Sequence, residues 1–218
     1  YILIDVNLLA DDNGKPRQLR LPEDKKPLVL TIEGLNYYAT RLKSGTNENL
    51  VLDKDGEVSG LYTDAAGNKV TAREAEAIGL LDAFVSANPD FSFDGAKGTI
   101  SLTGYECVFG YVTDPDQLDD RNQALEAVGL AQVSPNDSEI AANQETVKKI
   151  IKRLQATGWN FASSTYGFIN ARDQDMNRIV TDTEKWLAQV GSLTGRVRVL
   201  HYPNGAFING SDPRARYL

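Results

Sequence analysis

Short apolar runs rich in residues that favour strands predict the core strands of this chain. The runs cover residues 28–32, 98–102, 159–162 and 197–200. Each has about the length of a buried strand, and a proline, Pro27, directly precedes the first of them. We therefore expect these four segments to pair in the core of the protein.

Longer segments with apolar residues at helical spacing separate these runs. In the clearest case Ile140, Val147 and Leu154 share one face of a helix, and Gly158 stands where a C-cap belongs. A further helix is predicted over residues 176–190 from the same kind of spacing. The chain therefore alternates between core strands and helices in its second half.

The first half of the chain is predicted to contain one more helix, and a long connection is predicted to follow it. Thr71 and Glu74 have capping-box spacing, and the apolar stripe that follows them ends before Pro89. The stretch 111–136 is rich in polar residues and proline, so we expect mostly connection there, with a short helix near residues 124–128.

Turn residues mark two further parts of the chain. Asp55–Gly56 and Gly67–Asn68 separate short segments that favour strands, which predicts an antiparallel meander inserted at about residues 46–72. Residues 1–26 are polar apart from two short apolar stretches, so we expect an N-terminal arm there. The main domain would then cover residues 27–218.

The order of these elements predicts the fold class. Core strands that alternate with helices of a dozen or more residues need parallel pairing with crossover helices, so we expect an α/β fold with a small antiparallel insertion. In such folds ligands bind where strands end and the following loops begin. We call the four loops at these places the mouth: residues 33–38, 103–106, 163–168 and 202–206.

Composition and charge narrow the range of partners. The chain has 218 residues, 41% of them hydrophobic, so it can bury a core. Its 30 acidic and 23 basic residues leave a net charge of -7, which disfavours nucleic acid because binding a polyanion needs a basic surface. No apolar run is long enough to predict a membrane span. The sequence starts without Met or a charged leader, so we expect that it begins inside a longer protein.

Four blocks in and around the mouth follow one another in an order that points to a family. They are residues 31–38 (TIEGLNYY), 95–106 (GAKGTISLTGYE), 158–167 (GWNFASSTYG) and 202–205 (YPNG). In order and spacing they resemble the polysaccharide deacetylase family, also called the NodB-homology family or carbohydrate esterase family four, in a bacterial subgroup with a meander insertion. The resemblance implies a deformed, incomplete (β/α) barrel that removes acetyl groups from N-acetylated sugars.

The resemblance also implies roles for residues of the mouth. Glu33 stands at the general-base position, and the three positions that would hold a divalent metal of the zinc or cobalt type are Gly34, Ser164 and Phe168. Glycine has no side chain, phenylalanine has no donor atom, and a neutral hydroxyl cannot hold the ion alone. Metal-bound water supplies much of the power of such a hydrolysis. We therefore expect no cofactor and a catalytically degenerate protein.

Other residues leave catalytic alternatives open. His201, the only histidine, could join Glu33 and either Asp173 or Asp175 in a rebuilt centre, although histidine and glutamate alone fall short of the usual three protein ligands. Cys107, the only cysteine, could pair with His201 as nucleophile and base. The simpler interpretations are that Cys107 packs among apolar residues, that His201 makes a hydrogen bond at a strand end, and that Glu33 accepts hydrogen bonds from nearby backbone.

Polar and aromatic side chains of the mouth are the predicted ligand contacts. Tyrosines at strand ends can stack on sugar faces and hydrogen-bond to hydroxyl groups, or they can fill the rim of the fold. The predicted substrate-binding residues are Asn36, Tyr37, Tyr105, Ser164, Tyr166, Tyr202 and Asn204.

The sequence therefore predicts a polysaccharide deacetylase-like protein, secreted or in the cell envelope, that binds a glycan such as an acetylated amino sugar, or a cell-surface protein, without hydrolysing it. One alternative is an active hydrolase that cleaves the acetyl carbon–nitrogen bond of cell-wall sugars with an altered centre. Another is an interaction module of a larger surface protein. The chain ends at Leu218, soon after Gly205, where the family continues, so either the sequence stops early or the barrel is shorter.

Overall fold

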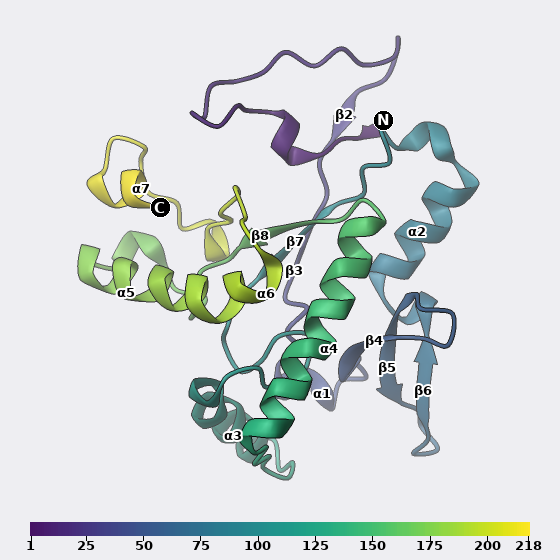
Figure 1. The fold of residues 1–218 in the computed structure, drawn as a ribbon, viewed down its shortest axis with the longest axis vertical. Coiled ribbons are helices and arrows are strands. Elements are labelled where there is room, and N and C mark those ends of the chain that lie inside the picture. Colours follow the sequence, from purple (N-terminus) through teal and green to yellow (C-terminus); the bar gives the residue numbers. More distant parts are fainter.

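A central sheet of three parallel strands organises the structure, a computed structural model of residues 1–218 (Figure 1). β3 (Thr31–Glu33) and β8 (Asn160–Ser163) flank β7 (Thr99–Leu102), and Ile32 lies beside Ile100 in this register. Every residue of β7 is buried, as expected of a central strand. The predicted parallel pairing and the α/β class are confirmed, and none of the sheets is closed into a barrel.

Helices connect and cover the strands. They are α1 (Ala39–Leu42), α2 (Ala77–Ala87), α3 (Leu118–Ala127), α4 (Asp137–Ala156), α5 (Met176–Trp186), α6 (Ser192–Thr194) and α7 (Pro213–Tyr217). α4 passes in front of the central sheet in Figure 1, and α5 continues through a π-helical turn into α6 beside it. The predicted helix over residues 176–190 is thus confirmed.

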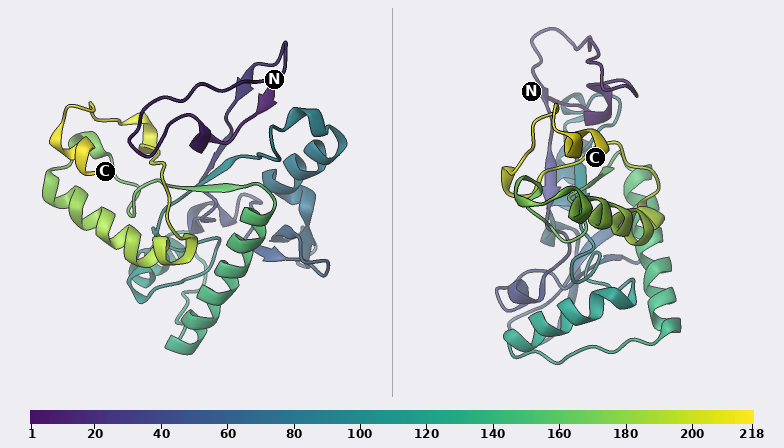
Figure 2. Two further views of the ribbon diagram at one scale, coloured as in Figure 1. Left: turned by 45° about the horizontal axis from the view of Figure 1, so that its top comes forward. Right: turned by 90° about the vertical axis from the view of Figure 1, so that its left-hand side faces the viewer.

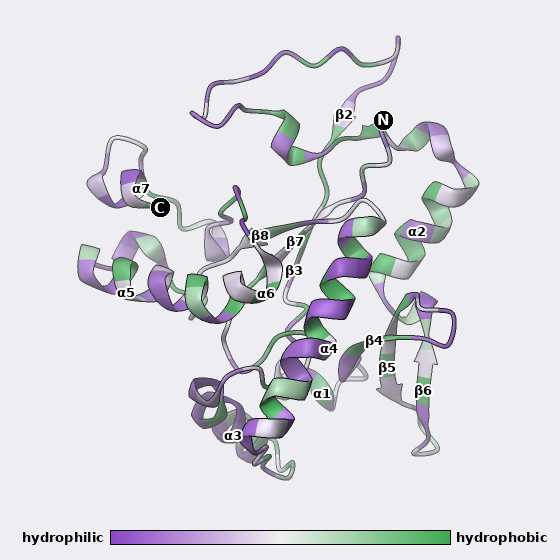
Figure 3. Ribbon diagram, in the orientation of Figure 1, coloured by the Kyte–Doolittle hydropathy of each residue, from purple (hydrophilic) through white to green (hydrophobic).

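The longest helix, α4, ends where Gly158 predicts, and a local capping box that the spacing of apolar residues did not reveal fixes its start. Asn136 and Glu139 form a capping box in which the Glu139 N–H donates to Asn136 Oδ1 at 3.1 Å and the Asn136 N–H donates to Glu139 Oε2 at 2.8 Å. Past the other end, Gly158 has a φ of +95°, which residues with a Cβ avoid. Apolar and polar turns alternate along α4 in Figure 3, and the buried side chains are Ile140, Val147, Ile150, Ile151 and Leu154.

One apolar cluster of 19 buried residues joins the sheet to α4, α5 and the meander. Trp159 and Trp186 are its largest fully buried side chains. The indole N–H of Trp186 donates to Leu102 O at 2.8 Å, so its burial leaves no unpaired donor. Burial of one large apolar side chain contributes roughly 1.5 to 3 kcal/mol. The loops of the mouth are therefore anchored on a well-packed core.

The predicted meander is confirmed as a separate antiparallel sheet of β4 (Asn49–Leu52), β5 (Val58–Thr63) and β6 (Lys69–Ala72). Its two turns contain Gly56 and Gly67, both at positive φ, as the turn dipeptides predict. In each turn a preceding aspartate accepts backbone hydrogen bonds across the loop. Local sequence is therefore enough to specify this element.

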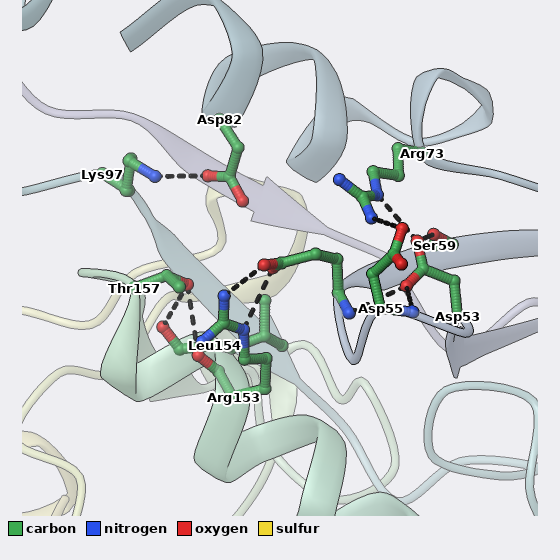
Figure 4. A network of polar contacts seen from close by, with 10 residues as sticks. Asp53, Asp55, Ser59, Arg73, Asp82, Lys97, Arg153, Leu154 and Thr157 are labelled. Atoms are coloured by element: carbon green, nitrogen blue, oxygen red, sulfur yellow. Dashed lines mark hydrogen bonds and ion pairs between the residues drawn. The ribbon is translucent and has the colours of Figure 1, made fainter. Parts of the chain in front are cut away.

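Ion pairs join the meander to the helices around it, as Figure 4 shows. The guanidinium of Arg153, near the end of α4, donates twice to the carboxylate of Glu57 in the meander. Lys97 pairs with Asp82 of α2 close by. We call the charged network the residues that make these ion pairs: Asp53, Asp55, Glu57, Arg73, Asp82, Lys97 and Arg153. Arg73 holds the pKa of Asp53 well below its usual value.

The N-terminal segment is partly integrated with the core. β1 (Ile2–Leu3) pairs in parallel with β2 (Pro27–Leu28), and Ile4 beside it is also buried. Between these strands the chain forms the long extended loop at one end of the molecule in Figures 1 and 2. Arg198 reaches this loop in an ion pair with Asp12 at 2.8 Å. No helix of the structure combines the length and apolar character needed to cross a membrane.

Two of the predicted core strands differ from the observed ones. The run 28–32 divides between β2 and β3, which belong to different sheets, and Val29 between them is exposed. The prediction of a strand at 197–200 is wrong, because this segment reaches β8 only at its last residue. There Leu200 forms a single bridge with Ser163, and the N–H of Ser163 donates to the carbonyl of residue 199 at 3.0 Å.

Two predicted helix starts are also wrong. Thr71 belongs to β6 and so cannot cap α2, which begins after Glu76, whose own carboxylate accepts the first helical N–H at 2.9 Å. α3 begins at Leu118, several residues before the predicted start. Its buried face includes a charged residue, Arg121, so the sequence shows no continuous apolar stripe to predict the helix.

Candidate functional site

The loops of the mouth meet at the carboxyl edge of the central sheet, and Asn36 links the first loop to the second. Its side-chain amide is fully buried and donates to Thr103 O at 3.1 Å, to Tyr105 O at 3.3 Å and to Cys107 O. A side chain that pairs with three carbonyl groups of another loop positions that loop. Asn36 is therefore enclosed, where a ligand cannot reach it in this conformation.

Close contacts link the third loop to the second loop and to His201, which directly precedes the fourth. The Gly104 N–H donates to Tyr166 O at 3.0 Å, and a Cβ at Gly104 would lie only 2.0 Å from the Tyr166 ring. Only glycine permits this approach. The His201 N–H donates to Ser163 O at 2.8 Å, and the buried Ser164 hydroxyl lies 3.5 Å from His201 O. The third loop therefore lies between the second loop and the start of the fourth.

Left-handed backbone at residues other than glycine is concentrated in the mouth. Five residues there have φ between +51° and +63°: Tyr37, Glu106, Thr165, Phe168 and Asn204. Only three such residues lie elsewhere, and two of those are aspartates, which tolerate this conformation best. Asparagine shares this tolerance, so the strained residues of the mouth are the other four; each costs about 1 to 3 kcal/mol, and such strain clusters at ligand-binding and catalytic sites.

A buried ion pair supports the first two loops from below. Glu106 and Arg121 of α3 lie 3.0 Å apart, with 2% and 8% of their side chains exposed. Glu106 also accepts from the Ala39 N–H at 2.9 Å, and Arg121 donates to Tyr37 O at 3.0 Å. Because both charges also make backbone hydrogen bonds, the pair fixes the position of the loops relative to α3.

Two of the predicted tyrosine contacts are buried below the surface of the mouth. The Tyr37 hydroxyl donates to Glu76 at 2.5 Å, and burial, together with this carboxylate, raises the pKa of Tyr37 well above its usual value. The ring of Tyr166 lies under the Lys185 ammonium at 4.5 Å, and burial raises the pKa of its phenol. Both tyrosines are enclosed by the fold rather than facing a ligand.

Asp182 holds the third loop in place. Its buried carboxylate accepts from the N–H groups of Tyr166 at 2.7 Å and Gly167 at 2.9 Å. A hollow of about 390 Å³ opens beside the same loop, with Ser163, Thr165 and Leu200 among its lining residues.

Tyr38 and Tyr105 form the accessible aromatic surface of the mouth. Both are half-buried, and their ring centres lie 5.8 Å apart at an angle of 56°. The Tyr38 hydroxyl lies 3.4 Å from Thr103 Oγ1, which orients the ring. The guanidinium of the exposed Arg41 lies 5.9 Å from the centre of the Tyr38 ring. Because the two rings are tilted, a flat ligand can stack on one of them while the other ring and the cation border it.

Glu33 and His201 provide the titratable groups at this edge. Glu33 is exposed at the end of β3, and His201 is half-buried beside the end of β8. Burial lowers the pKa of His201, and the Glu33 carboxylate acts in the opposite direction. The imidazole is therefore neutral at pH 7, and its Nδ1 is buried without a hydrogen-bond partner. Tyr202 is half-buried next to it, and Asn204 is exposed at the turn.

The three positions that the resemblance assigns to a metal do not form a ligand set. Gly34 has no side chain, the Ser164 hydroxyl lies against His201 O, and Phe168 brings only a hydrocarbon ring. The structure has no group of three or more His, Cys, Asp or Glu side chains arranged to hold an ion. The side chains at these three positions therefore do not fit a divalent metal of the zinc or cobalt type.

The remaining catalytic alternatives involve residues that are engaged elsewhere. The Cys107 thiol is fully buried and donates to Asn36 O at 2.7 Å, and burial raises its pKa to about 12, so it stays protonated and cannot act as a nucleophile. Asp173 accepts from Asn170 at 2.6 Å, and Asp175 caps α5. Neither aspartate is joined to Glu33 or His201 by a hydrogen bond.

Sequence reasoning missed the residues that shape the mouth most directly. Arg121 lies in a polar stretch with nothing to indicate its partner, and Arg41 lies just beyond the first loop. Glu106 carries one available signal, because it is a lone carboxylate directly after a buried strand and before the apolar run that starts at Cys107. An acid at such a place is seldom buried without a partner.

Comparison with protein-family models, curated proteins and solved structures finds no match for this chain. The functional interpretation therefore depends on the geometry of the mouth and on the resemblance of its sequence blocks.

Proposed function

We propose that this protein is a polysaccharide deacetylase-like glycan-binding protein that holds its ligand in the mouth without hydrolysing it. The observation that favours this most is the concentration of five non-glycine residues with left-handed backbone in the four loops of the mouth, four of them of types that avoid this conformation. Strain of this kind persists only where the surroundings enforce it, and here buried polar contacts do so. The proposal includes the incomplete barrel type and a cell-envelope location, both from the resemblance.

The accessible side chains of the mouth suit a neutral or weakly charged sugar. Tyr38 and Tyr105 offer ring faces on which the apolar face of a sugar ring can stack. Glu33 and Asn204 are exposed, so they can pair with hydroxyl and acetamido groups. The buried residues Asn36, Tyr37, Ser164 and Tyr166 then position the loops instead of touching the ligand.

Calorimetric titration with the β-1,4 tetramer of N-acetylglucosamine tests this proposal. We expect binding by the native chain and a loss of several-fold to about tenfold in affinity for Tyr105→Ala, since an aromatic contact contributes about 0.5 to 1.5 kcal/mol beyond its buried area. Tyr62→Ala, a half-buried tyrosine of the meander, is the matched control and should bind as the native chain does. No binding by the native chain, or an equal loss in both variants, would contradict the proposal.

A hydrolase with an altered centre is the second candidate, and one observation favours it. His201 is held neutral next to the Glu33 carboxylate, as a general base requires. In this case the native chain should release acetate from the same tetramer, and Glu33→Gln should abolish that release. Acetate production no faster than in buffer across a panel of acetylated sugars would eliminate the candidate.

A further inference from the structure

We infer that the mouth prefers a sugar that carries a carboxylate, and that Arg41 is the residue that binds it. This inference rests on the proposed glycan-binding function and assigns the chemical class of the ligand. It would add a specificity-determining residue outside the four sequence blocks of the mouth.

Arg41 is an exposed cation at the mouth whose guanidinium is free. It takes part in none of the ion pairs of the structure, and its side chain donates to no other residue. By contrast, the neighbouring Arg121 is fully engaged by Glu106 and Tyr37 O. All donors of Arg41 therefore remain available to an incoming ligand.

The backbone next to Arg41 places no side chain against the guanidinium. Gly34 has a φ of +81°, and a Cβ built there would meet only one atom within 4 Å, Arg41 Nη1 at 3.9 Å, which is an ordinary van der Waals contact. Because Gly34 has no Cβ, its backbone leaves this side of the guanidinium uncovered by a side chain. A larger residue at position 34 would be strained in this conformation and would lie against the guanidinium.

The ring of Tyr38 explains why a sugar acid fits better than a small anion. Arg41 lies 5.9 Å from the centre of this ring, which in turn contacts the ring of Tyr105. A sugar that stacks on Tyr105 and meets the edge of Tyr38 would have the guanidinium within reach of a carboxylate substituent. The planar fork of arginine binds the planar carboxylate through two parallel hydrogen bonds.

The other charges around the mouth allow one anionic group and discourage more. Glu106 is neutralised by Arg121, and His201 is uncharged at neutral pH. Glu33 and Asp120 of α3 have no ion-pair partner, and Asp120 adds to the effect of burial in raising the pKa of Tyr105. These carboxylates would accept hydrogen bonds from sugar hydroxyl groups and would repel a polyanion. The ligand therefore carries isolated carboxylates on an otherwise neutral sugar chain.

A matched pair of sugars tests the inference by calorimetry. The probes are a tetrasaccharide of alternating N-acetylglucosamine and glucuronate, and the same tetrasaccharide with its carboxylates converted to primary amides. We expect the native chain to bind the acid about tenfold or more tightly than the amide, the factor that one charge-assisted contact supplies. Inorganic phosphate at millimolar concentration should not displace the acid.

Variants at position 41 identify the residue responsible. Arg41→Gln should bind acid and amide equally, with its affinity for the amide unchanged, and Arg41→Lys should retain only part of the preference because an ammonium lacks the planar fork. Arg20→Gln, at an exposed arginine of the N-terminal segment, is the control and should keep the full preference.

The possible failures are distinguishable. If the native chain binds neither tetrasaccharide, the proposed glycan-binding function fails and the inference with it. If it binds the acid and the amide equally, or if Arg41→Gln keeps the preference, only the role of Arg41 is overturned. Displacement of the acid by phosphate would show a general anion site instead of a sugar-acid site and would also overturn the inference.

Discussion

The charged network and the mouth use charged side chains in opposite ways. In the charged network every member has an oppositely charged partner, as between Arg153 and Glu57. At the surface of the mouth Arg41 and Glu33 have no ion-pair partner, the backbone is strained, and His201 keeps an unpaired nitrogen. Charges that satisfy one another hold parts of the chain together, whereas unsatisfied charges on a strained scaffold are available to a ligand.

The largest expected effect concerns the buried pair beneath the mouth. Arg121→Met leaves Glu106 buried without its cation, so we expect the free energy of unfolding to fall by about 3 to 5 kcal/mol. The measurement is urea denaturation followed by tryptophan fluorescence, since Trp159 and Trp186 are fully buried.

A double variant distinguishes the cost of one unpaired buried charge from the contribution of the ion pair itself. Glu106→Gln combined with Arg121→Met removes both charges, so it should recover part of the stability that Arg121→Met alone loses. If the single variant were as stable as the native chain, the buried pair would not support the mouth.

Relief of backbone strain should give a smaller effect of opposite sign. Thr165 is β-branched at a φ of +63°, whereas asparagine tolerates this conformation and keeps an acceptor for the Ile169 N–H. We expect Thr165→Asn to raise the free energy of unfolding by up to about 1 kcal/mol and to weaken sugar binding. Thr194→Asn, at a buried threonine in α6, is the control and should destabilise.

An exposed ion pair of the same two residue types should contribute less to the free energy of unfolding. Arg153 and Glu57 are each about one third exposed, so Arg153→Met should lower the free energy of unfolding by only about 0.2 to 1 kcal/mol. Raising the salt concentration should shrink this difference, because exposed pairs are screened. A loss as large as that of Arg121→Met would remove the distinction between the two regions.

The smallest expected effect is a pH dependence of stability that arises from His201 beside the mouth. Burial lowers the pKa of folded His201 below the unfolded value of about 6.5, so the unfolded chain binds more protons between these two values. Stability from this group is complete above about pH 6.5 and is lost as the pH falls toward the folded pKa.

His201→Gln should remove this dependence. Its free energy of unfolding, compared with that of the native chain between pH 5 and 7.5, should approach the native value as the pH falls. A difference that stays constant over this range would mean that His201 does not titrate in the mouth.

Much of the fold followed from local patterns. Apolar spacing predicted α4, turn dipeptides predicted the meander, and alternation of strands with helices predicted parallel pairing. The errors at residues 197–200 and at the start of α3 occurred where partners decide the structure. A segment with the pattern of a strand needs a neighbouring strand of sufficient length, and a helix can bury a charged residue when a distant carboxylate pairs with it.

The sequence predicted the position of the candidate site in the fold more accurately than the residues that face a ligand there. The first three loops do follow the three strands of one sheet, and Glu33 lies close enough to His201 to affect its pKa. The same reasoning could not separate the half-buried Tyr105 from the buried Tyr37 and Tyr166, because a tyrosine at a strand end suits either position.

The sequence alone determined the alternation of strands and helices, the turns of the meander and the caps of α4, because hydrogen bonds and side-chain spacing within a few residues specify them. Tertiary structure decided which mouth residues are buried, that Glu106 meets Arg121, and that Arg41 remains unpaired beside Tyr38. These outcomes depend on distances between segments far apart in the chain, and burial or pairing of a charge depends on all the atoms that surround it.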